Sequence, residues 1–235
     1  GAVTYDVYQN AGNMAQVLVK AGVLVTNNDS VAPVVLDLNR DGQLDYSQTL
    51  MDVNNDGQLD QTAWAGRQDG VLVWDKYADG LVHDNSQYAF AQYATRYTSD
   101  KPATDLQGLA EAFDSNQDGV FDAQDAKFAE FKVWQDADQD GVSDAGEVRS
   151  LADVGVTEIN LVSDGVRRTP EVGVTEAGQS TANLADGGTM LVADAAFAYS
   201  TAQATASTLS SAKLAADASV AGDATSVEST TAELL

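Results

Sequence analysis

Hydrophobic and polar residues alternate in short runs along much of the chain, and clusters of turn-forming residues separate the runs. Residues 1–30 carry valines on one alternation and end in Asn-Asn-Asp-Ser, which predicts a β-prone lead segment closed by a loop. Residues 156–162 alternate as a strand does. Residues 172–192 predict a hairpin, with its turn at Asp186-Gly187-Gly188.

Helical spacing of apolar residues marks further parts of the chain. The stretches concerned are residues 86–97, 105–113, 123–134 and 147–154. Thr104 and Gln107 form a capping box that opens the second of them. The third places Phe128, Phe131 and Trp134 at helical spacing. We therefore expect four helices among the short strands.

The composition divides the chain into three parts. Residues 1–30 form the lead segment, residues 31–199 a central module, and residues 200–235 a linker rich in Ala, Ser and Thr. No apolar run approaches the ~18 residues that a spanning helix needs, so no membrane insertion is expected. Because the chain begins with Gly rather than Met, we expect it to be a segment of a larger protein with flanking domains.

The central module repeats one pattern five times. An apolar stretch leads into an aspartate, polar residues then alternate with Asp or Asn, and an Asp-Gly pair follows. We number the twelve-residue repeats loop one (residues 37–48), loop two (52–63), loop three (75–86), loop four (114–125) and loop five (136–147). The repeat indicates a local structure that the chain builds five times.

The charge of the chain restricts its partners. Asp and Glu number 36 against 12 Lys and Arg, so the net charge is −24, which would repel nucleic acid and anionic membranes. Aspartate accounts for 28 of the acids, although Glu is the better helix former, so turns or hard-cation ligation are indicated. Cysteine is absent, which excludes disulfides and thiolate chemistry. The single histidine, His83, leaves no His–carboxylate relay.

Loops four and five match a twelve-residue calcium loop, which places oxygen ligands at positions one, three, five, seven, nine and twelve and glycine at six. Their expected ligands are Asp114, Asn116, Asp118, Val120, Asp122 and Asp125 in loop four, and Asp136, Asp138, Asp140, Val142, Asp144 and Glu147 in loop five. Since residues 123–134 connect the two loops as a predicted helix, we expect an EF-hand-like pair of helix–loop–helix units.

Loops one and two have the same start but lack an acid at position twelve. Their expected ligands are Asp37, Asn39, Asp41, Gln43 and Asp45 in loop one, and Asp52, Asn54, Asp56, Gln58 and Asp60 in loop two. Nearby acids such as Asp69 are expected to complete a site. The two loops start too close together for an intervening helix, which predicts strand–loop geometry.

Loop three is a degraded copy of the pattern. It keeps Asp75 and Asp79 as candidate ligands but has Tyr77 at position three and His83 at position nine, so a weak site and an empty turn both remain open. The module as a whole is expected to have an α+β fold, with the EF-hand-like pair, short strands and hairpins, and strand-associated calcium loops. We expect four to five Ca²⁺ ions, whose binding would fold the chain, because the loop carboxylates repel one another without metal.

Five sequence pieces follow one another in a fixed order: Pro33-Val-Val-Leu-Asp-Leu-Asn-Arg-Asp-Gly, Asp52-Val-Asn-Asn-Asp-Gly, Asp69-Gly-Val-Leu-Val-Trp-Asp, Asp114-Ser-Asn-Gln-Asp-Gly, and Val133-Trp-Gln-Asp-Ala-Asp-Gln-Asp-Gly followed by Glu147-Val-Arg-Ser-Leu. In these pieces the module resembles the calcium-dependent self-processing module of RTX (repeats-in-toxin) exoproteins, which is also the split domain of large RTX adhesins. The resemblance implies a protein secreted to the cell surface or beyond by the type I route.

The resemblance also implies an autoproteolytic activity. In such modules calcium triggers cleavage of an Asp–Pro bond, as the Asp side chain attacks its own carbonyl to form an anhydride that water or an acceptor lysine opens. The matching proline is Pro33, but the residue before it is Ala32, so cleavage of the 32–33 bond is not expected in this chain. Either an Asp was replaced here, or this member has lost the activity. The alternatives are a non-cleaving, calcium-rigidified spacer and, lower in rank, a dockerin-like binding module.

Overall fold

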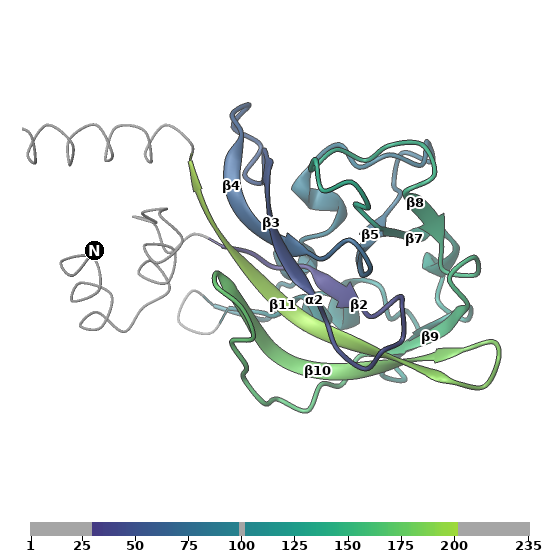
Figure 1. Ribbon diagram of the computed structural model, residues 1–235. Coiled ribbons are helices and arrows are strands. Elements are labelled where there is room, and N and C mark those ends of the chain that lie inside the picture. Colours follow the sequence, from purple (N-terminus) through teal and green to yellow (C-terminus); the bar gives the residue numbers. More distant parts are fainter. Residues whose placement is uncertain (1–29, 99–101, 202–235) are drawn as a thin grey trace, which may run out of the picture.

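A computed structural model describes residues 30–98 and 102–201 of the chain (Figure 1). The strands are β1 (Ser30–Val31), β2 (Val34–Leu36), β3 (Tyr46–Met51), β4 (Asp60–Ala65), β5 (Gly70–Trp74), β6 (Val120–Asp122), β7 (Phe131–Trp134), β8 (Val148–Ser150), β9 (Val156–Asn160), β10 (Val174–Leu184) and β11 (Thr189–Thr201). The helical elements are α2 (Asp105–Ala112) and the 3₁₀ turns η3 (Asn85–Gln87), η4 (Phe90–Tyr93) and η5 (Phe128–Glu130). No helix in this part of the chain is long and apolar enough to cross a membrane.

One antiparallel sheet of 11 strands organises these residues. Its main path runs β6-β9-β10-β11-β2-β5-β7-β8, and β11 also pairs with β1 and β4. Figure 1 shows β10 and β11 crossing the molecule as long, curved neighbours, so that the sheet curls like half of a barrel. This hairpin confirms the prediction made for residues 172–192, and β9 confirms the strand predicted from residue 156.

The central strands of the sheet are buried on both faces, which explains why β2 and β5 are uniformly apolar rather than alternating. In β2, Val34 and Leu36 point into one hydrophobic cluster, while Val35 points into a second cluster on the other face. In β5, Leu72 joins the first cluster, and its neighbours join the second. A strand covered on both faces needs apolar residues at consecutive positions.

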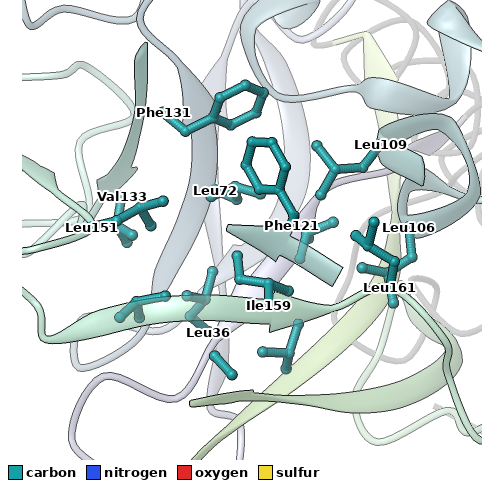
Figure 2. Packing of buried hydrophobic residues seen from close by; sticks show 14 of the residues in the cluster. Leu36, Leu72, Leu106, Leu109, Phe121, Phe131, Val133, Leu151, Ile159 and Leu161 are labelled. Atoms are coloured by element: carbon teal, nitrogen blue, oxygen red, sulfur yellow. The ribbon is translucent and has the colours of Figure 1, made fainter. Parts of the chain in front are cut away.

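The first cluster lies between the sheet and α2. Figure 2 shows Leu106 and Leu109 of α2 facing Phe121 and Ile159 across the packed side chains. The helix begins at the predicted capping box, in which Thr104 and Gln107 exchange hydrogen bonds with one another's backbone amides. That prediction is confirmed.

The second cluster is built around a group of aromatic rings. Trp64, which is almost fully buried, has ring centroids of Tyr88, Trp134 and Phe197 at 5.3–5.6 Å in tilted or edge-on arrangements. Burial of an aromatic side chain of this size contributes several kcal/mol to the free energy of folding. Trp64 and Trp134 are therefore core residues that join strands distant in sequence.

The prediction of an α+β fold with EF-hand-like helices is wrong. The described part of the chain is mostly β, and α2 is its one α-helix. Loop four follows α2 but contains the strand β6, and loop five connects β7 to β8. Residues 86–97 contain two short 3₁₀ turns instead of a helix, and residues 147–154 begin with β8. The helix pairs on which a dockerin-like arrangement would depend are absent from these residues.

The error in residues 123–134 has a definite physical cause. Phe131 and Trp134 do fall at helical spacing, but they lie in β7, where Phe131 and Val133 face the first cluster and Trp134 faces the second. Because the strand is buried on both faces, its pattern of apolar residues is not period two and resembles a short helical stripe. Pairing of β7 with both β5 and β8 then favours the extended conformation.

The predicted outer segments fall mainly outside the described residues. Of the lead segment, residues 1–29 lie outside them, and Ser30 belongs to β1. Of the predicted linker, residues 202–235 lie outside, whereas β11 continues to Thr201.

Candidate metal centres

The five aspartate loops share one backbone conformation. Position four has a left-handed φ of 57–68° in every loop, and the residues there are Arg40, Asn55, Ala78, Gln117 and Gln139. These are the only non-glycine residues with positive φ in the described part of the chain. The glycine at position six is also left-handed, with φ of 72–84°. Since this conformation costs a side-chain-bearing residue about 1 kcal/mol, its fivefold repetition indicates a structure imposed by the loop.

A common set of hydrogen bonds holds this conformation. The first-position carboxylate accepts a hydrogen bond from the glycine amide at position six, at 2.8–3.3 Å. The acceptors are Asp37, Asp52, Asp75, Asp114 and Asp136. The fifth-position carboxylate accepts from the amide at position seven, at 2.8–3.1 Å. The pairs are Asp41 with Gln43, Asp56 with Gln58, Asp79 with Leu81, Asp118 with Val120, and Asp140 with Val142.

Four loops add a bond from the third position. Its side-chain oxygen accepts from the amide at position five, at 2.9–3.4 Å, and the residues are Asn39, Asn54, Asn116 and Asp138. In loops one, two, four and five, these bonds hold the side chains of positions one, three and five against backbone amides of the same turn. The turn therefore gathers three of the predicted ligand positions, as calcium ligation requires. In loop three only positions one and five are held in this way.

In loops four and five, the carboxylate at position twelve accepts hydrogen bonds from backbone amides of its own loop. In loop four, Asp125 accepts from the amides of Ser115 and Asp122, at 2.7 and 3.0 Å. In loop five, Glu147 accepts from the amides of Ala137 and Asp144, at 2.8 and 3.2 Å. These donors are positions two and nine of their loops, so the last carboxylate of each loop ties its two ends together.

In loop one this closing role belongs to Asp69, which lies beyond the twelve residues of the loop. Its Oδ2 accepts from the amide of Asp45, position nine, at 2.6 Å. Burial raises the pKa of Asp69 to about 7, and the amides of Asp45 and Leu38 oppose that rise. Leu38 is position two, so Asp69 faces the same two amides that Asp125 and Glu147 bind in their own loops.

Loop two has an unusual ninth residue. Asp60 is fully buried in the first position of β4, and neither oxygen of its carboxylate has a hydrogen-bond partner. Burial raises the pKa of Asp60, opposed by the amide of Val53 and reinforced by the charges of Asp56 and Asp52. A buried carboxylate without partners is costly unless it is protonated or meets a cation.

Loop three has the common backbone but a weaker set of ligands. Asp75 accepts from the glycine amide only at 3.3 Å, and exposed Tyr77 supplies no carboxylate or amide oxygen at position three. The Oδ2 of Asp79 lies 2.8 Å from Nε2 of His83, and this interaction lowers the pKa of Asp79. Asp79, one of the two candidate carboxylate ligands of loop three, is thus already paired with the imidazole of His83.

The donor atoms that remain fit a hard divalent cation. Besides Asp60, Asp37 and Asp69 each bury one oxygen, Oδ1, without a hydrogen-bond partner, while Oδ2 is held by a backbone amide. In loop five, ligand atoms of Asp136, Asp138 and Glu147 lie within 4.8 Å of one another, as do those of Asp138, Asp140 and Asp144. Clusters made only of carboxylate and amide oxygens suit Ca²⁺.

The loops are also hydrogen-bonded to one another. Asn55 of loop two and Asn85 of loop three exchange two bonds, at 2.8 and 3.2 Å. Ser143 of loop five is buried, and its hydroxyl accepts from the amide of Val82 in loop three at 2.7 Å. Position eight of loop five thus forms a polar link between two loops.

Comparison with known proteins gives a clear result. A family model described as the SPM domain matches residues 34–198, which include all five loops and the hairpin of β10 and β11. The chain belongs to the SPM-domain family. The iron-regulated protein FrpA of Neisseria meningitidis serogroup C is 33% identical to this SPM domain over 167 residues. That alignment covers 69% of the chain but only 15% of FrpA.

The SPM domain also buries two carboxyl groups that sequence reasoning missed. Asp194 lies in β11 and accepts a hydrogen bond from the amide of Asp105, the first residue of α2, at 3.0 Å. Asp105 itself accepts from the amides of Phe90 and Ala91, at 3.0 and 2.6 Å. An Asp among the apolar residues that directly follow the predicted hairpin was the available signal for Asp194.

Burial raises the pKa of both groups. For Asp105 the rise is opposed by the amides of Ala91 and Phe90 and reinforced by the charge of Asp194. For Asp194 the rise is opposed by the hydroxyl of Thr104 and by the amides of Asp105 and Leu106. Neither group belongs to a calcium loop of the SPM domain.

Ala32 and Pro33, the predicted head of the module, lie between β1 and β2. Both of these strands pair with β11 in one continuous register, Val31 with Phe197 and Val34 with Asp194. The amide of Ala195 donates to the carbonyl of Pro33 at 3.0 Å. The 32–33 peptide bond is therefore held within the sheet.

Proposed function

We propose that this SPM domain is a calcium-binding module of a secreted RTX-type protein. The observation that carries the proposal is the fivefold repetition of one loop, with carboxylate oxygens of Asp37, Asp60 and Asp69 buried and left without hydrogen-bond partners. The likeness to FrpA and the resemblance to RTX exoproteins support the same class of protein. We further propose four to five bound Ca²⁺ ions, about one for each loop.

Calcium would act here through folding. The bound ions would neutralise carboxylates that otherwise repel one another, and ligands from separate strands would be fixed relative to one another. Calcium is scarce in cytosol and abundant outside cells, so the module would be loose before export and compact afterwards. This behaviour fits secretion to the cell surface or beyond, for which the type I route is the proposed path.

We also propose that the form of this module with Asp at position 32 cleaves its own 32–33 bond. The support is positional, since the bond lies in the sheet four residues before Asp37, the first residue of loop one. Because the amide of Ala195 holds the carbonyl of Pro33, the backbone around the bond has a fixed orientation. Fixed orientation of reacting groups can lower a barrier by several kcal/mol.

The chemistry needs only the chain itself and water. A carboxylate at position 32 attacks its own carbonyl carbon, the bond to the nitrogen of Pro33 breaks, and a five-membered cyclic anhydride remains at residue 32. Water then opens the anhydride, or a lysine amine of a neighbouring chain does so and forms an isopeptide bond. In the present chain Ala32 has no attacking group.

The test is the Ala32→Asp variant, incubated with millimolar Ca²⁺ and, in parallel, with chelator. Mass spectrometry is expected to find fragments of residues 1–32 and 33–235 only in the calcium sample, and the unchanged chain serves as the control. A variant that folds with calcium but stays intact for days would favour the alternative function, a calcium-rigidified spacer that does not cleave. That result would leave the calcium-binding proposal standing.

A further inference from the structure

Position 32 and Asp194 lie on the same face of the sheet. Val34 pairs directly with Asp194, and Val34 points into the first hydrophobic cluster, so Asp194 points to that side as well. Ala32 is two residues from Val34 along the strand and therefore faces the same side. Its place in the register is opposite Ala196, and Asp194 is its diagonal neighbour.

The hydrogen bonding of the ladder brings these positions close. Ala195 and Pro33 occupy a hydrogen-bonded pair of the ladder. Only one of the two usual bonds forms, because proline has no N–H to donate. The pairs on either side, of position 32 with Ala196 and of Val34 with Asp194, are therefore the close, non-hydrogen-bonded kind. Asp194 directly opposes Val34, the residue that follows Pro33, so its side chain stands beside the 32–33 bond.

Asp194 is a buried carboxyl group with one acidic neighbour on its face, and it accepts hydrogen bonds from the Thr104 hydroxyl and the amides of Asp105 and Leu106. The elements packed against it are β2, which presents only Val34–Leu36, α2, which presents Asp105, and β10, which presents Glu176. Glu176 lies on the opposite face, where it accepts a hydrogen bond from Tyr46 at 2.7 Å. Burial favours the protonated form of a carboxyl group. At Asp194 it outweighs the opposing hydrogen bonds, so the pKa is raised.

We propose that Asp194 is the proton donor for cleavage of the 32–33 bond in the form with Asp at position 32. This inference rests on the proposed self-cleavage. The carboxylate of residue 32 attacks its own carbonyl carbon, and the electron pair of the breaking C–N bond goes to the nitrogen of Pro33. That nitrogen takes the proton of the Asp194 carboxyl, which becomes a carboxylate. The products are a cyclic anhydride at residue 32 and a secondary amine at Pro33, and Asp194 regains a proton from water.

The experiment compares three full-length variants in saturating Ca²⁺: Ala32→Asp alone, and the same chain with Asp194→Asn or Glu176→Gln added. Asparagine keeps an oxygen that can accept from the Asp105 amide but has no acid proton. Loss of a general acid is expected to slow cleavage by about 100-fold or more. In that variant, the decrease in cleavage rate at alkaline pH (the alkaline limb), which reports loss of the Asp194 proton, should also disappear. Glu176→Gln changes an equally buried acid on the other face and should leave both the rate and the profile as they were.

The outcomes separate the two proposals. If Ala32→Asp does not cleave, the proposed self-cleavage fails and this inference fails with it. If it cleaves and Asp194→Asn cleaves as fast with the same alkaline limb, only the role of Asp194 is overturned. Should Asp194→Asn not fold, as judged by tryptophan fluorescence, Thr104→Ala provides the second test. The Thr104 hydroxyl bonds to Asp194 and lowers its pKa, so its removal should move the alkaline limb to higher pH, and an unmoved limb would overturn the inference.

Discussion

The carboxylate of Asp69 accepts a hydrogen bond at 2.6 Å from the backbone amide of Asp45, which lies 24 residues earlier in the chain. Asp69 lies in the turn between β4 and β5, while Asp45 closes the loop between β2 and β3. Loop one is therefore completed by a residue from a different part of the sheet. Metal binding in this loop and pairing of these strands should consequently depend on one another.

Asp69→Asn is expected to weaken calcium binding to loop one and to reduce the stability gained from calcium. The amide side chain can still accept from Asp45 but carries no charge for the cation. Loss of one site filled to ten times its dissociation constant corresponds to about 1.4 kcal/mol of unfolding free energy. Denaturant unfolding with and without Ca²⁺ measures the difference. Asp153→Asn, in a turn outside the loops, is the matched control, and an equal effect there would contradict the role of Asp69.

The affinities of the loops should follow their ligand sets, with loops four and five filling first and loop three last. Glu147→Gln removes the carboxylate that closes loop five and should abolish its tight binding step in a calorimetric titration with Ca²⁺. Asp79→Asn should change the titration little, because Asp79 is paired with His83 in a loop whose third position is Tyr77. Equal losses in the two variants would refute this ranking.

Without calcium, stability should fall as the pH rises from about 4 to about 7. Burial, reinforced by nearby charges, raises the pKa of Asp69 to about 7 and that of Asp136 to about 6. A carboxyl group whose pKa is higher in the folded state than in the unfolded state binds its proton more tightly when folded. Its stabilising contribution is full below the unfolded pKa of about 4 and is lost as the pH passes the folded pKa.

Metal-free protein should therefore resist urea better at pH 5 than at pH 7.5, whereas calcium affinity should rise over the same range because protons and Ca²⁺ compete for the carboxylates. Urea unfolding and calcium titration at the two pH values measure the two trends. Asp69→Asn should flatten the first trend. A metal-free protein that is more stable at pH 7.5 would show that other groups dominate.

Gly108→Ala should destabilise the fold even though alanine is the better helix former. A Cβ at this position of α2 would lie 2.1 Å from the carbonyl oxygen of Phe90, so the helix would have to move away. Overpacking of this kind costs about 1–3 kcal/mol, against a helix-propensity gain of about 1 kcal/mol. Urea unfolding in calcium gives the sign. Gly188→Ala in the exposed hairpin turn is the control, and a stabilised Gly108→Ala protein would contradict the close packing of α2.

The sequence allowed the loops to be predicted well because their constraints are local. Alternating polar oxygens and a glycine at position six fix the turn by bonds within a few residues, such as that from the Gly42 amide to Asp37. The turn of the final hairpin and the capping box at Thr104 are local in the same sense. Whether each loop binds metal remains a prediction.

The helix predicted over residues 105–113 is confirmed by α2, but the one predicted over residues 123–134 is wrong because tertiary pairing determined the structure there. Phe131 and Trp134 suit a helical stripe, but in β7 they fill opposite faces of a sheet that is buried on both sides. The buried pair of Asp105 and Asp194 could not be predicted from the sequence either. The two residues are 89 positions apart, and only the packing of α2 against β11 brings them together.

Thermal unfolding followed by tryptophan fluorescence, first in chelator and then in millimolar Ca²⁺, tests the central claim that calcium folds this module. Four sites at tenfold saturation would contribute about 6 kcal/mol, which corresponds to a rise in Tm of roughly 10–20 °C for a domain of this size. Magnesium should reproduce little of it, because it retains its water in preference to protein oxygens. A chain that melts at the same temperature, with the same spectrum, in chelator and in calcium would contradict the account.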